Sequence, residues 1–297
     1  MKVTFDTKIA SALGVSLLPG TRVGVELEYE SFDASLVNMM NLPSWNLAID
    51  HSLRNGGLEF VSVPLTLSKV DGALLEVQQA LDANKAAEAN KRCGVHVHVN
   101  ATHITMKQLW AWTTYYQLIE AFIFKEFADG REENHFCVPT WANTNLQEYF
   151  YRDATALYRG ITKPSKKNGS DDPYMALHKP QLLNVLRNSK YSAMNLSALK
   201  KFGTIEFRQM RGTRRMEVVR KWVHFLARLH ECATSYEDAE AVLAEFESNG
   251  FERLCGRLGL HQSSSVNKDD IIDCIDGAYM MVGHAPTNFE DLTWEIS

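Results

Sequence analysis

Residues 22–30 alternate strictly between apolar side chains and side chains that are charged or absent. Val, Val, Leu and Tyr occupy the odd positions, and the even positions include Glu26, Glu28 and Glu30. Successive side chains of a β-strand point to opposite faces, so this period of two predicts a strand with one core-facing side. The acidic side faces away from that core. A chain with such a strand is expected to build a sheet that is buried on one face only.

Two later segments repeat this pattern with other polar residues. In residues 94–100 the odd positions are all valine, and the even ones include His96 and His98. In residues 203–211, Glu206 and Arg208 alternate with apolar residues. Both segments are therefore predicted to be strands with a polar face of their own.

A hairpin is predicted from residues 45–51 and 57–64. The Asn-Gly-Gly sequence between these two segments is typical of a tight turn. The hairpin brings two further acids, Asp50 and Glu59, to the sheet.

Helices are predicted between and after these strands, at residues 68–92, 105–128, 215–233, 236–247 and 268–282, with one more near 147–158. In the first of them the expected buried stripe is Leu75, Val77, Ala80 and Leu81. Strands that come early, and then singly between helices, favour an α+β fold. We expect a mainly antiparallel sheet with the helices packed on one face.

Composition excludes several classes of protein. The net charge of -5 favours neither nucleic acid nor an anionic membrane as a partner. Five cysteines without CxxC spacing indicate neither a zinc cluster nor a disulfide framework. No apolar run approaches the roughly 20 residues of a membrane span, and the first residues do not resemble a signal peptide. A soluble, cytoplasmic protein is expected.

Three or more strands carry acids, imidazoles and a guanidinium. These groups would repel one another, or would leave charges without a partner, unless ions bound among them. Carboxylates dominate and thiolates are missing from these strands, which favours Mg²⁺, or alternatively Mn²⁺, over structural zinc. Arg208, two residues after Glu206, indicates an anionic ligand such as phosphate. No P-loop or dinucleotide-binding motif is present. The pattern therefore predicts nucleotide phosphate chemistry without a P-loop.

At these residues the chain resembles the putative amidoligase family, which belongs with glutamine synthetase and glutamate–cysteine ligase in the carboxylate–amine ligase superfamily. The resemblance covers roughly residues 22–225. The matching pieces, in family order, are Gly24–Glu28, Gly57–Phe60, Gly94–Asn100, Asn134–Cys137, Lys190–Asn195 and Thr204–Arg208. It implies one catalytic domain over residues 1–297, with a helical C-terminal extension at 226–297. It also implies a curved, glutamine-synthetase-like sheet whose open face holds the active site.

The resemblance assigns roles to individual residues. The implied metal ligands are Glu26, Glu28, Glu59, His96 and Glu206, with Asp50 as a further candidate and His98 as a neighbour that lines the pocket. Arg208 would steady the transferred phosphoryl group. Arg211 and Lys190 would contact phosphate or a substrate carboxylate, although the family often has arginine where this chain has Lys190. Cys137 is expected to be structural.

The implied reaction is ATP-dependent amide formation between a carboxylate and an amine, through an acyl phosphate and with Mg²⁺ bound. The substrates would be small molecules or peptides. Glu30 or His98 is the candidate base for the amine proton. Residues 163–173 or 129–150 are candidate lids. Two alternatives stay open: a metal-dependent hydrolase that uses His96, His98 and the carboxylates, and a non-catalytic protein of the same fold.

Overall fold

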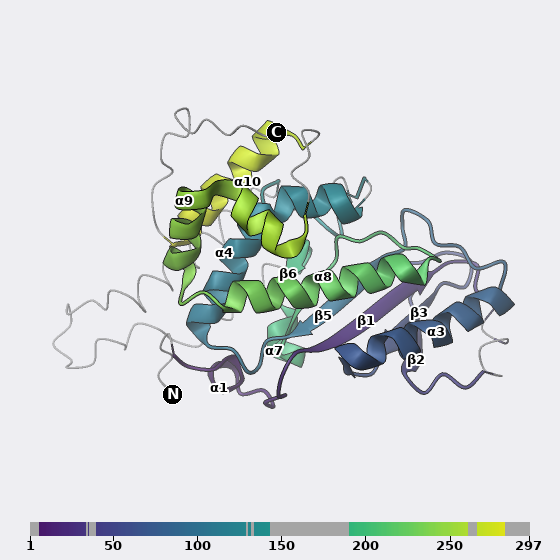
Figure 1. The fold of residues 1–297 in the computed structure, drawn as a ribbon. Coiled ribbons are helices and arrows are strands. Elements are labelled where there is room, and N and C mark those ends of the chain that lie inside the picture. The colour runs from purple at the N-terminus through teal and green to yellow at the C-terminus, as the bar shows by residue number, and fades with distance from the viewer. Residues whose placement is uncertain are drawn as a thin grey trace.

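The computed structural model describes residues 6–33, 35, 40–128, 130–131, 134–142, 190–260 and 266–282 (Figure 1). One sheet runs through this part of the chain, with the strand order β2-β3-β1-β5-β7-β6 and with β4 paired to β1. Every pairing between these strands is antiparallel. The strands are β1 (Arg22–Tyr29), β2 (Trp45–Ile49), β3 (Leu58–Ser62), β4 (Leu65–Thr66), β5 (Val95–Asn100), β6 (Met194–Asn195) and β7 (Thr204–Phe207). The predicted α+β class and mainly antiparallel sheet are therefore confirmed.

The register of the central strands places the predicted polar positions side by side. Glu26 lies opposite His96 across β1 and β5, and His98 lies opposite Glu206 across β5 and β7. Directly opposed residues of an antiparallel pair have Cβ atoms about 4.5–5.5 Å apart. The polar faces of these three strands therefore form one continuous face.

Helices cover the opposite, apolar face of the sheet. The side chains on that face, among them Leu27, Val97 and Phe207, are fully buried. α8 (Met216–Thr234) packs on β5, and α3 (Leu67–Ala83) packs beside α8, nearer to β2 and β3 in Figure 1. The polar residues occupy the other side of the sheet, away from these helices, and Glu28, His96, His98 and Glu206 are buried there as well.

A second layer of helices surrounds α4 (Met106–Ile123). This helix begins with a capping box formed by Thr105 and Gln108. Nearly every side chain of α4 is buried, because α8, α9 (Ala239–Leu258) and α10 (Lys268–Val282) pack around it. A π-helical turn, η1 (Phe124–Ala128), extends it. The two short helices are α1 (Ile9–Leu13) and α7 (Ala198–Phe202). One hydrophobic core continues from the sheet into these helices.

Several predicted boundaries were wrong. The helix predicted for residues 68–92 ends at Ala83, and Leu75 is 58% exposed. Position 75 lies off the stripe of buried residues, which follows the spacing 70, 73, 74, 77, 80 and 81. The strand predicted for 203–211 ends at Phe207.

The helix predicted for 236–247 instead runs from Ala239 to Leu258, across a kink at Gly250, where φ is 59°. α1 was not predicted. The helix near 147–158 and the candidate lid 163–173 lie outside the described residues, as does much of 129–150.

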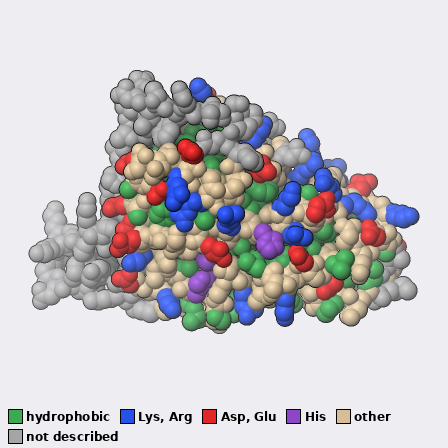
Figure 2. All heavy atoms as spheres, viewed as in Figure 1, with side chains coloured by type: hydrophobic (Ala, Val, Ile, Leu, Met, Phe, Trp, Pro, Cys, Tyr) green, Lys and Arg blue, Asp and Glu red, His purple; other side chains and the backbone are tan. Residues whose placement is uncertain are grey.

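Within the described residues, no helix is both long and apolar enough to cross a membrane. On the face shown in Figure 2, Lys and Arg side chains intermingle with Asp and Glu side chains. No single sign of charge dominates that face.

Candidate active site

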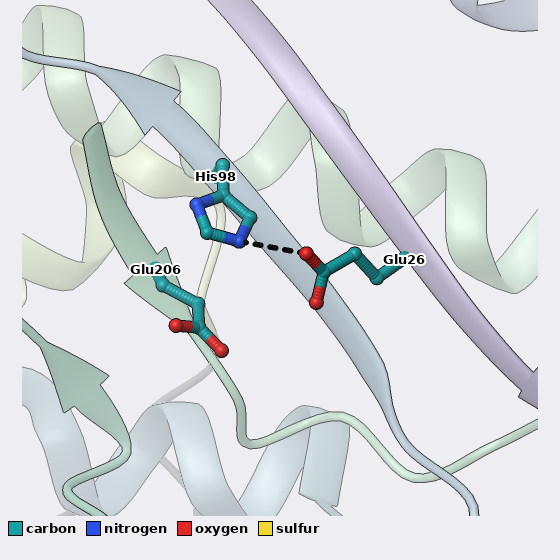
Figure 3. A group of neighbouring side chains, drawn as sticks. All are labelled: Glu26, His98 and Glu206. Atoms are coloured by element: carbon teal, nitrogen blue, oxygen red, sulfur yellow. Dashed lines mark ion pairs between the residues drawn. The ribbon is translucent and has the colours of Figure 1, made fainter. Parts of the chain in front are cut away.

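Glutamate and histidine side chains from neighbouring strands converge on the sheet face that the helices leave open. In Figure 3, Glu26 of β1, His98 of β5 and Glu206 of β7 project toward one another, with helices behind the sheet. These three offer ligand atoms that all lie within 4.8 Å of one another, and so do Glu26, Glu59 and His96. Glu26 belongs to both sets, so the two sets adjoin.

Glu26 lies between the two histidines. One of its carboxylate oxygens is 3.2 Å from Nε2 of His98, and the other is 3.3 Å from Nδ1 of His96. Burial raises the pKa of Glu26, but the hydrogen bonds and charges of the two imidazoles outweigh burial and hold the pKa well below its usual range. Burial lowers the pKa of His98, whereas Glu26 and Glu206 raise it, and the balance lies above the ordinary value.

Glu59 has the opposite electrostatic environment. It lies on β3 opposite Glu28 of β1, within a concentration of negative charge. Burial and then the neighbouring carboxylates raise its pKa to about 8; these carboxylates are Glu26, Glu28, Asp50 and Glu206. Asp50 follows β2 and accepts the backbone N–H of Ser52 at 2.8 Å, and it belongs to neither ligand set. A bound cation would remove the repulsion that keeps Glu59 protonated.

Glu206 has two fixed partners. Asn195 of β6 donates from Nδ2 to one carboxylate oxygen at 2.6 Å, and Arg208 donates from Nη1 to the other. Arg208 also donates from Nε to the carbonyl oxygen of Phe136 at 3.1 Å. The guanidinium is therefore held beside the acids, where it can contact an anionic ligand.

Glu28 lies toward the start of β5. It accepts the backbone N–H of Gly94 at 2.6 Å, and its other oxygen is 3.8 Å from Nε2 of His96. A Cβ at position 94 would lie 2.6 Å from Nε2 of His96 and 2.8 Å from Nη1 of Arg131. Glycine at this position therefore lets the His96 imidazole and the Arg131 guanidinium approach the backbone closely.

Glu30 stands apart from the two ligand sets. Its carboxylate accepts hydrogen bonds from the backbone N–H of Arg54 at 2.8 Å, from Nδ2 of Asn90 at 2.7 Å and from Nε of Arg92 at 3.0 Å. Burial raises its pKa, but these hydrogen bonds outweigh burial and lower the pKa. Glu30 thus ties the end of β1 to the segment that precedes β5.

The two outlying cations predicted for phosphate are exposed, and neither belongs to a ligand set. Arg211 pairs with Gly94 through its backbone, near Glu28, and its side chain is exposed. Lys190 is exposed, with Nζ 5.4 Å from the centre of the Tyr191 ring. Their contacts with a ligand stay predictions.

Two residues at the site were missed in the sequence. Arg131 is buried, and its Nη1 donates to two backbone carbonyls at 3.0 Å. Burial lowers its pKa, and the charge of Glu28 opposes that effect. Asn195 holds Glu206 as described above. Asn195 ends the Lys190–Asn195 motif, which could have identified it, but Arg131 lies in an aperiodic polar segment that carries no such signal.

The donor chemistry fits a hard divalent cation. Both ligand sets combine carboxylate oxygens with one imidazole, and within the described residues neither set includes a thiolate. Oxygen-rich sets of this kind suit Mg²⁺ or Mn²⁺. Burial is the largest cause of the raised pKa of Glu59, and four neighbouring carboxylates raise it further, so negative charge is concentrated on this face.

Comparison with protein-family models places the chain in a family. A protein-family model described as "putative amidoligase enzyme" matches residues 20–230. That range contains every strand of the sheet and both ligand sets. A search of curated proteins found no match.

Proposed function

Because the chain belongs to the putative amidoligase family and is thus a ligase-type enzyme, we propose that it is an ATP-dependent carboxylate–amine ligase. One observation carries the proposal. Glu26 joins two adjacent carboxylate–imidazole sets, and Arg208 is hydrogen-bonded to Glu206 of one set. A site for divalent cations beside a fixed guanidinium is what ATP phosphates require.

Mg²⁺ bound to these sets would neutralise negative charge on the phosphates during phosphoryl transfer. Glu26, Glu59 and His96 would hold one ion, and Glu26, His98 and Glu206 the other. Asn195 orients Glu206 through the 2.6 Å hydrogen bond, so it acts as a positioning residue.

In the proposed first step, an oxygen of the substrate carboxylate attacks the γ-phosphorus of ATP. That O–P bond forms as the bond to the ADP oxygen breaks, and the product is an acyl phosphate. Arg208 and the buried Arg131 supply fixed positive charge at one end of the site. Their positions are set before substrate binds, because backbone carbonyls already hold both guanidinium groups.

In the second step, the amine nitrogen attacks the acyl carbon. The C–N bond forms, the bond from carbon to the phosphate oxygen breaks, and the amine loses a proton. The geometry favours neither candidate base. Glu30 already accepts three hydrogen bonds, and a His98 that binds a metal ion through Nε2 has its other ring nitrogen, Nδ1, 2.9 Å from Oγ1 of Thr204. The departing phosphate is the proton acceptor that the reaction itself supplies.

The proposal is tested by thermal unfolding with ATP, with Mg²⁺ and with both. A ligase with this site is stabilised most when both are present. Glu26→Gln should abolish the added stabilisation, because Glu26 belongs to both sets. Glu252→Gln, an exposed change on α9, is the matched control and should leave it intact. Phosphate release that needs both a carboxylate and an amine then identifies the reaction.

The same measurements distinguish the two alternatives. A metal-dependent hydrolase would be active without ATP and would bind zinc tightly. A non-catalytic protein would show neither stabilisation by Mg²⁺ with ATP nor an effect of Glu26→Gln. Either result would refute the ligase proposal.

A further inference from the structure

A pocket of about 270 Å³ opens on the sheet face next to the ligand sets. Glu26 and His98 form one end of it, so a molecule in the pocket touches the set that contains Glu206. Ligand pockets usually measure about 300–1,000 Å³, so this volume suits one small substrate and is too small for a whole nucleotide.

Glycine forms the floor of the pocket. Gly24 occupies a position of β1 where the alternation would otherwise place a side chain on the polar face, between Arg22 and Glu26. It lies opposite His98, and a Cβ there would lie 3.5 Å from the His98 Cβ, which is an ordinary contact. The pocket therefore exists because residue 24 has no side chain, and alanine would fit without a collision.

The side walls of the pocket are largely apolar. They include Leu18, Val61, Pro64 and Phe202. Phe202 is 51% exposed, and its ring meets the His98 ring edge to face at 5.7 Å. An exposed aromatic ring beside a pocket is available to pack against the methylene groups of a ligand.

The loop that contains Leu18 is held in place by two residues, Asn100 at the end of β5 and Thr102 just beyond it. Asn100 donates from Nδ2 to the carbonyl oxygens of Leu18 and Gly20 at 2.9 and 2.8 Å. Thr102 accepts the backbone N–H of Leu18 at 2.9 Å. The pocket is therefore shaped before any ligand enters.

Arg22 forms the end of the pocket away from the ligand sets. Its side chain is partly buried and lines the pocket, and its Nε has no hydrogen-bond partner among the described residues. Nε itself has almost no accessible surface, so a carboxylate of a ligand would pair with the terminal nitrogens of the guanidinium group through charge-assisted hydrogen bonds. The pocket thus has a cation at one end, apolar walls in the middle and the cation-binding acids at the other end.

We propose that this pocket binds the acid substrate, and that this substrate is a small dicarboxylate with a short methylene chain. One carboxylate reaches the Glu26–His98 end, the methylene groups lie over Gly24 against Phe202, and the second carboxylate accepts a hydrogen bond from Arg22. An amine is excluded as the occupant, because the guanidinium of Arg22 repels an ammonium group. This assignment rests on the proposed ligase function for the role of the bound acid.

The test compares six-carbon ligands with different end groups. Binding of adipate, hexanoate and 1,6-diaminohexane is measured by calorimetry in the presence of Mg²⁺ and without nucleotide. Adipate should bind at least tenfold more tightly than hexanoate, and the diamine should not bind. In Arg22→Gln the preference for adipate over hexanoate should disappear.

Gly24→Leu gives a second, independent readout. It fills the pocket without altering a proposed metal ligand, so it should abolish adipate binding while thermal stabilisation by ATP with Mg²⁺ persists. Gly24→Ala is the control for folding and should retain the preference for adipate. Equal binding of adipate and hexanoate to the unaltered protein would overturn the proposal, and so would a preference that survives in Arg22→Gln.

These outcomes distinguish the proposal that the pocket binds a dicarboxylate from the proposal that the protein is a ligase. Selective adipate binding without stabilisation by ATP and Mg²⁺ would support the pocket and refute the ligase function. Stabilisation by ATP and Mg²⁺ without selective adipate binding would refute the pocket alone.

Discussion

Binding of Mg²⁺ should expel a proton from Glu59. A pKa of about 8 means that roughly 0.9 of the Glu59 carboxyl groups carry a proton at pH 7, and roughly 0.1 do at pH 9. A metal binds only the ionised carboxylate, so binding releases that proton. The expected release from Glu59 is therefore about 0.9 proton per site at pH 7, and it falls to about 0.1 at pH 9.

Isothermal titration of the protein with Mg²⁺ measures this release. Titrations in buffers with different ionisation enthalpies give the number of protons from the slope of observed enthalpy against buffer enthalpy. The pKa of His98 is also raised, chiefly because Glu26 outweighs the effect of burial, so any proton that His98 loses on metal binding adds to the total. Glu59→Gln isolates the share of Glu59, as the glutamine has no proton to lose.

The expected result is a difference of about 0.9 proton between the unaltered protein and Glu59→Gln at pH 7, which falls to about 0.1 proton at pH 9. A difference near zero at pH 7 would refute the reasoning, since it would mean that burial and the surrounding carboxylates do not keep Glu59 protonated. The direction of the Glu59 pKa shift also determines how the stability of the fold depends on pH. In the metal-free protein the folded state binds the proton more tightly than the unfolded state, so the Glu59 contribution to stability is lost as pH rises from about 4.5 to about 8.

Three further predictions concern single side chains. Gly94→Ala should weaken binding of ATP with Mg²⁺ at least tenfold in a thermal-shift titration, because the new Cβ would displace His96 and Arg131. Unchanged binding would show that the His96 and Arg131 side chains do not lie as close to residue 94 as the structure places them. Arg214→Met should lower the free energy of unfolding by about 2 kcal/mol in urea, because Arg214 donates to three backbone carbonyls at and beyond the end of α3. Asp238→Ala should cost about 1 kcal/mol in the same assay, because Asp238 caps α9 by accepting the Ala241 N–H at 2.9 Å; a cost near zero would show that the cap contributes nothing.

Much of the sheet could be predicted because side-chain direction along a strand is a local property. The alternation in residues 22–30 and 94–100 determined which residues face the core, and the structure buries those valines and Leu27 completely. Helix ends were harder to predict. The helix that begins at Leu67 stops at Ala83 rather than at residue 92, and three carbonyls at and beyond its end are bound by Arg214, more than 120 residues later in the chain. No local pattern contains that information.

The sequence by itself determined that Glu26, His96, His98 and Glu206 each point away from the apolar side of their own strand. Only the tertiary structure decided that they share one face, since strand order and register depend on contacts between distant segments. It also showed that Glu30, on the same face of β1, is bound to Arg92 and lies outside both ligand sets. The alternation along the strand points these glutamates in the same direction. Their roles differ because each one has different hydrogen-bond partners.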